Sequence, residues 1–221
     1  MSARSLTRAE VREVDRRAIS DYSMIGLVLM ENAGRGAVEL LLRLKVRGSV
    51  VVCAGKGNNA GDGFVMARHL ENQGVGVEVF LFSDPAELSA DAAANFRVIH
   101  AAKTPIRLVP ADDSLDEFAI ACQRSDWVID ALLGTGTQGD IREPYASVIS
   151  RINASGSKVL AVDLPSGLDC DTGTVLGCCV VANNTATFVA RKRGFDNADS
   201  TANTGDVHVI DIGVPKIMLD R

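Results

Sequence analysis

The sequence predicts an α/β protein, a Rossmann-like three-layer α/β/α sandwich around a mostly parallel sheet, with an N-terminal helical extension. From residue 49 onward, short runs rich in β-branched residues alternate with segments of helical periodicity. These runs are continuously apolar, as parallel strands covered on both faces require. With 221 residues, 47% of them apolar, the chain has the size of one domain. We expect a single domain over residues 1–221, with helices in 1–46 and the α/β core in 47–221.

Two helices are expected before the first strand. Thr7 and Glu10 fit a capping box, and Val11 and Val14 then fall on one apolar face. A longer apolar pattern begins at Ser23 and contains several glycines, which permit close helix packing. This pair of helices could pack over an edge of the sheet or serve as a lid.

Seven strands and four further helices are expected in the core. The strands are the apolar runs Ser49–Ala54, Val75–Phe82, Ile106–Leu108, Asp126–Leu133, Ser157–Leu164, Thr185–Ala190 and Asp206–Ile212. The helices lie between them, at Phe64–Gln73, Ala90–Ala102, Ser114–Gln123 and Pro144–Ser155. Ser114 and Glu117 fit a second capping box, and Pro144 is placed like the first residue of a helix.

Composition and charge exclude several classes of protein. The net charge is −5 and the Lys and Arg residues are scattered, so nucleic acid is not an expected partner. The chain has 5 cysteines, an odd number, and no C-x-x-C pair, so we expect neither a disulfide framework nor a zinc site. Together with the lack of a signal-peptide core and of a membrane-spanning run, this predicts a cytoplasmic protein without a membrane partner.

The first candidate site segment runs from Val50 to Gly63. A strand, a glycine-rich turn and a helix start follow one another there, which points backbone N–H groups at an anion. The turn fits the dinucleotide pattern G-x-G-x-x-A, whereas no Walker A Lys-Ser pair is present, so ordinary NTP hydrolysis is not expected. Asn58, Asn59 and Asp62 add side-chain oxygens. Because Asp62 would repel a bare phosphate, we expect the site also to hold a cation, a ribose hydroxyl or a reacting group.

Two further candidate segments follow predicted strands. Asp130–Asp140 contains G-x-G-x-x-G, so two glycine loops could bind two ends of a phosphate-rich ligand or wrap one diphosphate; two tight turns would explain the same glycines. Ala161–Asp169 places Asp163 at the end of an apolar strand, where burial would raise its pKa and suit general acid–base catalysis. A turn or helix-capping aspartate is the alternative at this position.

Five motifs stand in one order along the chain. They are V-L-M-E-N-A-G at Val28–Gly34, G-K-G-N-N-A-G-D-G-F-V-M-A-R-H-L at Gly55–Leu70, D-A-L-L-G-T-G with R-E-P-Y within Asp130–Tyr145, A-V-D-L-P-S-G-L-D at Ala161–Asp169, and G-D-V-H-V-I-D-I-G-V-P at Gly205–Pro215. Together they resemble the YjeF N-terminal domain family, the NAD(P)H-hydrate epimerases, over nearly the whole chain. One departure is Ala60, where family members usually have glycine.

The resemblance implies a Rossmann-like fold and epimerisation at nicotinamide C6 of hydrated NADH or NADPH, abbreviated NADHX and NADPHX. The R hydrate is converted to the S form, which a separate ATP- or ADP-dependent dehydratase repairs. The family binds potassium (K⁺) and is usually a homodimer. Since this chain ends soon after Pro215, we expect it to supply the epimerase alone.

The positions that match the family imply the site residues. Substrate contacts are expected from Asn58, Asn59, Ala60, Gly61, Asp62, Gly134, Thr135, Gly136, Thr137, Gln138, Gly139, Asp140 and Asp163. Potassium is expected at Asn59, Asp130 and Ser166, whose amide, carboxylate and hydroxyl oxygens suit a hard cation. Asp163 is the expected catalytic acid–base group. Lys192 is a weaker electrostatic candidate, which we expect to be solvated.

Two other functions remain open. Some members of the family are non-catalytic scaffolds that have lost the enzyme site, but Asn59, Asp130 and Asp163 are all present here. An NAD-dependent oxidoreductase would use the same fold. It would need an acidic residue at the end of the second strand to bind ribose, and Asp84 lies late for that role.

Overall fold

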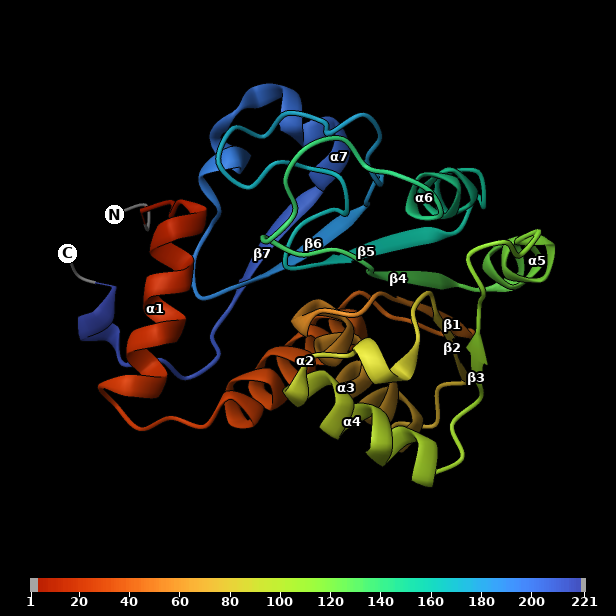
Figure 1. Ribbon diagram of the computed structural model, residues 1–221, viewed down its shortest axis with the longest axis horizontal. Helices are drawn as coiled ribbons and strands as arrows, with labels where there is room; N and C mark the ends of the chain where they lie inside the picture. Colours follow the sequence, from red (N-terminus) through yellow and green to blue (C-terminus); the bar gives the residue numbers. More distant parts are fainter. Residues whose placement is uncertain (1–3, 220–221) are drawn as a thin grey trace.

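The computed structural model describes residues 4–219, which form a seven-stranded parallel sheet in the order β3-β2-β1-β4-β5-β6-β7 (Figure 1). The strands are β1 Val50–Ala54, β2 Val77–Leu81, β3 Ile106–Leu108, β4 Trp127–Ala131, β5 Lys158–Val162, β6 Asn184–Phe188 and β7 Asp206–Ile210. β1 pairs with β2 on one side and with β4 on the other, so the chain winds outward in two directions from this pair. The carboxyl ends of β1 and β4 therefore mark the switch point where such folds bind ligands.

Helices cover both faces of the sheet. They are α1 Arg8–Ser20, α2 Gly26–Arg43, α3 Asn58–Asn72, α4 Ala90–Ala101, α5 Asp116–Arg124, α6 Tyr145–Asn153 and the short α7 Thr201–Thr204. Short 3₁₀ turns occur at Pro85–Glu87, Arg193–Asp196, Ala198–Ser200 and Lys216–Met218. Figure 1 shows α2, α3 and α4 on one face and α5 and α6 on the other. The predicted three-layer α/β architecture is confirmed.

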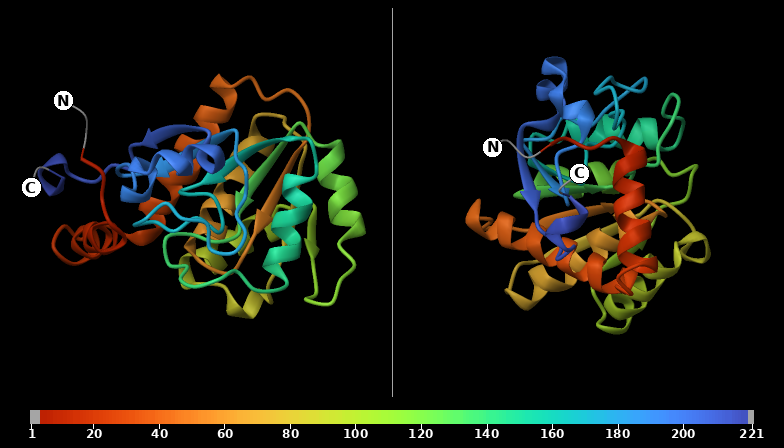
Figure 2. Two further views of the ribbon diagram at one scale, coloured as in Figure 1. Left: turned by 90° about the horizontal axis from the view of Figure 1, so that it is seen from above. Right: turned by 90° about the vertical axis from the view of Figure 1, so that its left-hand side faces the viewer.

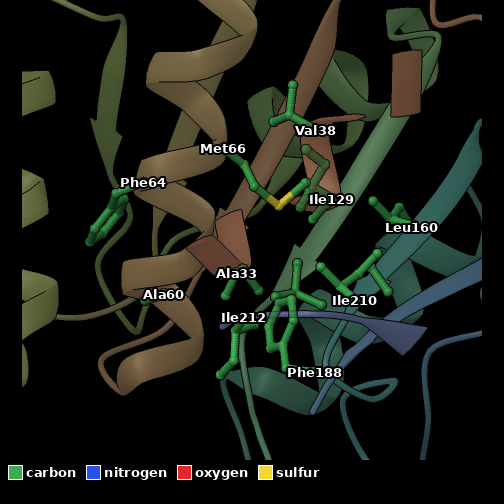
Figure 3. Packing of buried hydrophobic residues seen from close by; sticks show 14 of the residues in the cluster. Ala33, Val38, Ala60, Phe64, Met66, Ile129, Leu160, Phe188, Ile210 and Ile212 are labelled. Atoms are coloured by element: carbon green, nitrogen blue, oxygen red, sulfur yellow. The ribbon is translucent and has the colours of Figure 1, made fainter. Parts of the chain in front are cut away.

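Alternate residues of a strand face opposite helix layers. In β1, Val50, Val52 and Ala54 belong to the apolar cluster beneath α2 and α3, whereas Val51 and Cys53 belong to the cluster beneath α5 and α6. Figure 3 shows the first cluster, in which side chains of α2 and α3 meet those of β4, β5, β6 and β7. Because both faces are covered, the strand is apolar at every position, as the sequence indicates.

All seven predicted strands are present, and Ile106–Leu108 has the predicted bounds. Several of the others end earlier than their apolar runs do. Leu132 and Leu164, which follow β4 and β5, are buried although they lie outside the strands. The apolar runs are longer than the strands because the loops at the carboxyl ends of the sheet are themselves packed.

The helix α3 begins at Asn58, well before the predicted start at Phe64. Asparagine and glycine are poor helix formers, but packing decides here. A Cβ on Gly63 would lie 2.8 Å from the Cβ of Ala131, so only glycine lets the first turns of α3 approach the sheet this closely. The first glycine segment is therefore mainly a helix N-terminus and only briefly a loop.

The helix caps are partly as predicted. The Thr7 capping box is present, with Glu10 N donating to Thr7 Oγ1 and Thr7 N donating to the Glu10 carboxylate. The Ser114 box is wrong, because Leu115 is the N-cap of α5 and no side chain caps that helix. Pro144 occupies the N-cap position of α6, directly before its first helical residue.

The N-terminal helix α1 stands apart from the helices on the two faces of the sheet (Figures 1 and 2). The segment before it is attached to the chain beyond β6, where Leu6 N donates to Arg191 O and Arg193 N donates to Leu6 O. Within residues 4–219, no helix combines the length and the apolar content needed to cross a membrane.

Candidate functional site

A cavity of about 570 Å³ lies at the carboxyl ends of β1, β4, β5 and β6. Its walls come from α1, α2, the start of α3 and the loops after these strands. The predicted substrate residues that line it are Asn58, Asn59, Asp62, Gly134, Thr135, Gly136, Thr137 and Asp163. The structure thus brings the two glycine segments and the end of β5 to one cavity at the switch point of the sheet.

The other predicted substrate residues do not line this cavity. Ala60 is fully buried in the apolar core, where glycine is not required because the position is helical. A Cβ on Gly61 would lie 2.5 Å from the sulfur of Met30, so this residue packs α3 against α2. Residues 138–140, the last three of the second glycine segment, are exposed.

Close approach of the loops after β1 and β4 shapes the cavity. Gly55 N donates to Ala131 O at 3.2 Å, and a Cβ on Gly55 would lie 2.0 Å from Leu132 O. No residue with a side chain fits there without moving one loop. Glycine at this position therefore holds both glycine segments at the same edge of the cavity.

The chain turns sharply at the ends of β5 and β6. Asp163 and Val189 both have positive φ, 67° and 70°, and both line the cavity. A β-branched residue such as Val189 adopts this conformation rarely, and such strain concentrates at functional sites.

Lys192 reaches this cavity from the loop after β6. Its side chain is fully buried, and its ammonium lies 2.6 Å from Asp163 Oδ1 while donating to Phe188 O at 2.9 Å. The expectation of a solvated lysine is wrong. The signal was its position, because Lys192 follows a strand closely, as Asp163 does.

Two more carboxyl groups, those of Asp62 and Asp15, interact electrostatically with this ion pair. Burial raises the pKa of Asp62 well above its usual range, and the charges of Asp163 and Asp15 raise it further. The pKa of Asp15, on α1, is raised to about 6, first by loss of solvation and then by Asp163. The cavity therefore holds a buried carboxyl group with a raised pKa, Asp62, and a second one, Asp163, that is paired with Lys192.

The three predicted potassium residues lie in one hydrogen-bonded network. Ser166 donates from Oγ to Asp130 Oδ1 at 2.6 Å and from its backbone N to Oδ2 at 2.8 Å. Leu133 N donates to Ser166 Oγ, and Asn59 Nδ2 donates to Leu133 O at 3.0 Å. Burial raises the pKa of Asp130 to about 6, although the bonds from Ser166 and Leu132 oppose that shift. Carboxylate, hydroxyl and carbonyl oxygens lie together here beside the amide group of Asn59, and this set of groups suits a hard cation.

Sequence reasoning missed the contribution of α1. Arg8 donates from Nε to Thr135 O at 2.6 Å and from Nη2 to Thr137 O at 3.1 Å. The same Nη2 lies 2.8 Å from Asp169 Oδ2, so one guanidinium joins α1, the second glycine segment and the loop after β5. Arg12 and Asp15 follow on α1 and line the cavity. Helical spacing does place a carboxyl group, Asp15, next to the apolar positions of α1, which was the available signal.

The comparisons with known proteins agree with one another. Residues 26–194 match the family model described as YjeF-related protein N-terminus. The chain is 45% identical to a Pirellula staleyi protein named NAD(P)H-hydrate epimerase, over 97% of this chain and 94% of that protein. A Rhodopirellula baltica protein of the same name is 40% identical, over 97% and 86% of the two chains.

Longer relatives contain a matching part. A bifunctional NAD(P)H-hydrate repair enzyme Nnr of Salinibacter ruber is 39% identical over 98% of this chain, and the match spans 42% of that protein. The crystal structure of the yeast protein YNL200c superposes with a TM-score of 0.78 over 93% of this chain and 87% of that chain. At 20% identity, this likeness shows a shared fold.

Proposed function

The chain belongs to the YjeF-related protein N-terminus family, and from this premise we propose that it is an NAD(P)H-hydrate epimerase. It is an isomerase that interconverts the R and S forms of hydrated NADH or NADPH at nicotinamide C6. One observation carries the proposal. Two aspartates, the buried Asp62 and Asp163 in contact with the buried Lys192, face one cavity at the switch point of a Rossmann-like sheet.

Epimerisation at C6 needs one group that can accept a proton and another that can donate one. The hydrate is a carbinolamine, so inversion at C6 requires either loss and return of the hydroxyl or opening and closing of the ring, and each route moves protons. Asp163 is the proposed acid–base group, and the ammonium of Lys192, 2.6 Å from its Oδ1, orients it. Asp62 is placed to donate a proton to a departing hydroxyl. The N-terminus of α3 and the second glycine segment bind the phosphates.

We also propose a potassium ion held by Asn59, Asp130 and Ser166. The donor chemistry supports it, since Asp130 is buried without a cationic partner among the residues that the structure describes. A bound cation would supply positive charge that offsets Asp130 and the diphosphate of the substrate.

The S hydrate is passed to a separate ATP- or ADP-dependent dehydratase, and the enzyme works in the cytoplasm as a homodimer. The names of the bifunctional relatives support the pairing with a second repair step. Apolar side chains exposed near the start of α2, Ile25 and Val28, support self-association. Light scattering measures the oligomeric state directly.

The decisive experiment follows the R and S hydrates by chromatography after addition of the purified protein. Interconversion faster than in buffer, with unchanged absorbance of reduced nicotinamide, supports an epimerase. A change in that absorbance would indicate an oxidoreductase. No acceleration, with nucleotide binding retained, would indicate a non-catalytic binding module.

A further inference from the structure

The helix α1 lies outside the part of the chain that matches the family model, yet it forms one wall of the cavity. Its position is fixed by Arg8, whose side chain is 10% exposed and pairs with Asp169. The bonds from Arg8 to the carbonyl oxygens of Thr135 and Thr137 attach α1 directly to the second glycine segment.

Arg12 follows Arg8 by one helical turn on the same side of α1. It lines the cavity beside this glycine segment, and a Cβ placed on Gly136 would lie 3.6 Å from its Nη2. Within residues 4–219 its guanidinium has no hydrogen bond and no ion pair, in contrast to the other two cations that line the cavity. Lys56 pairs with Glu87 at 3.0 Å, and Lys192 pairs with Asp163.

We infer that Arg12 binds the diphosphate of the dinucleotide substrate against the second glycine segment. This inference rests on the proposed function for the identity of the substrate. Glycine at position 136 leaves the backbone open to an oxyanion, and a guanidinium beside it supplies the charge and paired donors that phosphate oxygens need. The helix α1 is thus a substrate-binding element. Arg8 holds α1 against the second glycine segment, and this places Arg12 where it can contact the diphosphate.

The distribution of charge supports the diphosphate as the group bound. The carboxyl groups of Asp62 and Asp163 lie near Lys192, where a phosphate would be repelled, and Asp15, three residues after Arg12 on α1, interacts electrostatically with Asp163. An unpaired guanidinium next to a glycine-rich backbone is the arrangement that a phosphate requires. We therefore expect the diphosphate at Arg12 and the second glycine segment, and the reacting ring near Asp163 and Lys192.

The test compares Arg12→Met with Arg16→Met. Arg16 lies on the same helix, is exposed, pairs with Glu13 and does not line the cavity, so it is a matched control for loss of one charge. We expect Arg12→Met to raise KM for both NADHX and NADPHX about 10- to 100-fold, the range for a charge-assisted hydrogen bond, with kcat within about twofold. The KM of Arg12→Lys should lie between those of the wild type and Arg12→Met. The KM of Arg16→Met should match that of the wild type.

A binding measurement separates this inference from the proposed activity. ADP-ribose carries the diphosphate but no hydrated ring, so its dissociation constant, measured by calorimetry, should rise in Arg12→Met and lose its dependence on salt. A wild type that binds ADP-ribose through Arg12 but does not epimerise would overturn the proposed function and support this inference. Equal affinity in Arg12→Met and Arg16→Met would overturn the inference, as would an effect confined to NADPHX, which would assign Arg12 to the 2′-phosphate.

Discussion

The ammonium of Lys192 lies 2.6 Å from Asp163 Oδ1, and the lysine is wholly enclosed by protein while the aspartate faces the cavity. Thr187 Oγ1 and Phe188 N donate to the same carboxylate oxygen at 3.3 Å. These contacts hold the side chain of Asp163 in one orientation, in a position reached through a positive φ. Among residues 4–219, its neighbour Asp62 forms no ion pair, and burial raises the pKa of that carboxyl group well above its usual range, so the two aspartates of one cavity stand in different environments.

Removal of Lys192 should destabilise the protein, because it breaks the ion pair with Asp163. Lys192→Met leaves a nearly buried carboxylate without its cation, so we expect the free energy of unfolding to fall by about 3–5 kcal/mol. Adding Asp163→Asn should restore part of the loss, since the unpaired charge is then gone. Urea denaturation measures both effects. Lys56→Met, which breaks an exposed ion pair, should change stability by no more than about 1 kcal/mol; equal losses in the two lysine variants would contradict the account.

Asp163→Asn should lower kcat about 10²–10⁴-fold, because it keeps the shape of the side chain but cannot transfer a proton. The dissociation constant for substrate should change far less than kcat. Interconversion of the R and S hydrates, followed by chromatography, is the assay. Asp62→Asn must be measured alongside, since Asp62 is the rival base. If Asp163→Asn keeps wild-type turnover while Asp62→Asn loses it, the two roles are exchanged.

Much of the fold follows from local patterns. The strand β1 is apolar at every position because helices cover both of its faces, and that continuous run also locates the glycine segment that follows it. The early start of α3 could not be read this way, because Gly61 and Gly63 oppose a helix locally. They favour it only once Met30 and Ala131 lie against them, and those contacts come from distant segments.

In the candidate site too, some residues are predictable from the local sequence, and others depend on contacts between distant segments. Asp163 stands out in the sequence as a carboxyl group at the end of an apolar strand. The burial of Lys192 cannot be predicted from the sequence, because a lysine in a loop is usually solvated. Only the fold brings Asp163 next to it as a partner. The role of Arg8 depends on Asp169, far away in the sequence, so the possible lid expected of the N-terminal helices came without the contacts that attach α1 to the cavity.

Arg8→Lys tests whether the planar fork of arginine positions the second glycine segment. Lysine keeps the charge but cannot serve the carbonyl oxygens of Thr135 and Thr137 and the carboxylate of Asp169 together. We expect a loss of about 1–3 kcal/mol in the free energy of unfolding and a rise of about tenfold in the dissociation constant for ADP-ribose. Arg16→Lys is the control. If Arg8→Lys is destabilised but binds ADP-ribose with wild-type affinity, Arg8 stabilises the fold and does not position the second glycine segment for the ligand.

Gly136→Val tests the approach of a ligand to the same segment. The added Cβ would meet only Arg12, at 3.6 Å, so the variant should fold with little change in stability. A branched side chain above the backbone should nevertheless keep phosphate oxygens away, and the dissociation constant for dinucleotides should rise. Isothermal titration with NADPH measures it. A folded variant with wild-type affinity would show that the two glycine segments do not share one nucleotide.

The potassium site should be sensitive to pH through Asp130. Burial raises the pKa of this carboxyl group from 3.8 to about 6 in the folded protein without a cation, so between these values the folded state binds more protons than the unfolded state. Its contribution to stability is therefore greatest below the unfolded pKa and is lost as pH rises toward 6. A cation favours the ionised form, so potassium and protons compete for Asp130.

Added potassium should accordingly raise the melting temperature at pH 7.5, and the effect should fade as pH falls through about 6. Tetramethylammonium chloride at equal concentration controls for ionic strength, because the ion is too large for the site. Asp130→Asn should remove the potassium effect at every pH, since it deletes the only formal charge among the three ligands. A potassium effect of equal size at pH 5 and pH 7.5, or one that persists in Asp130→Asn, would place the ion elsewhere.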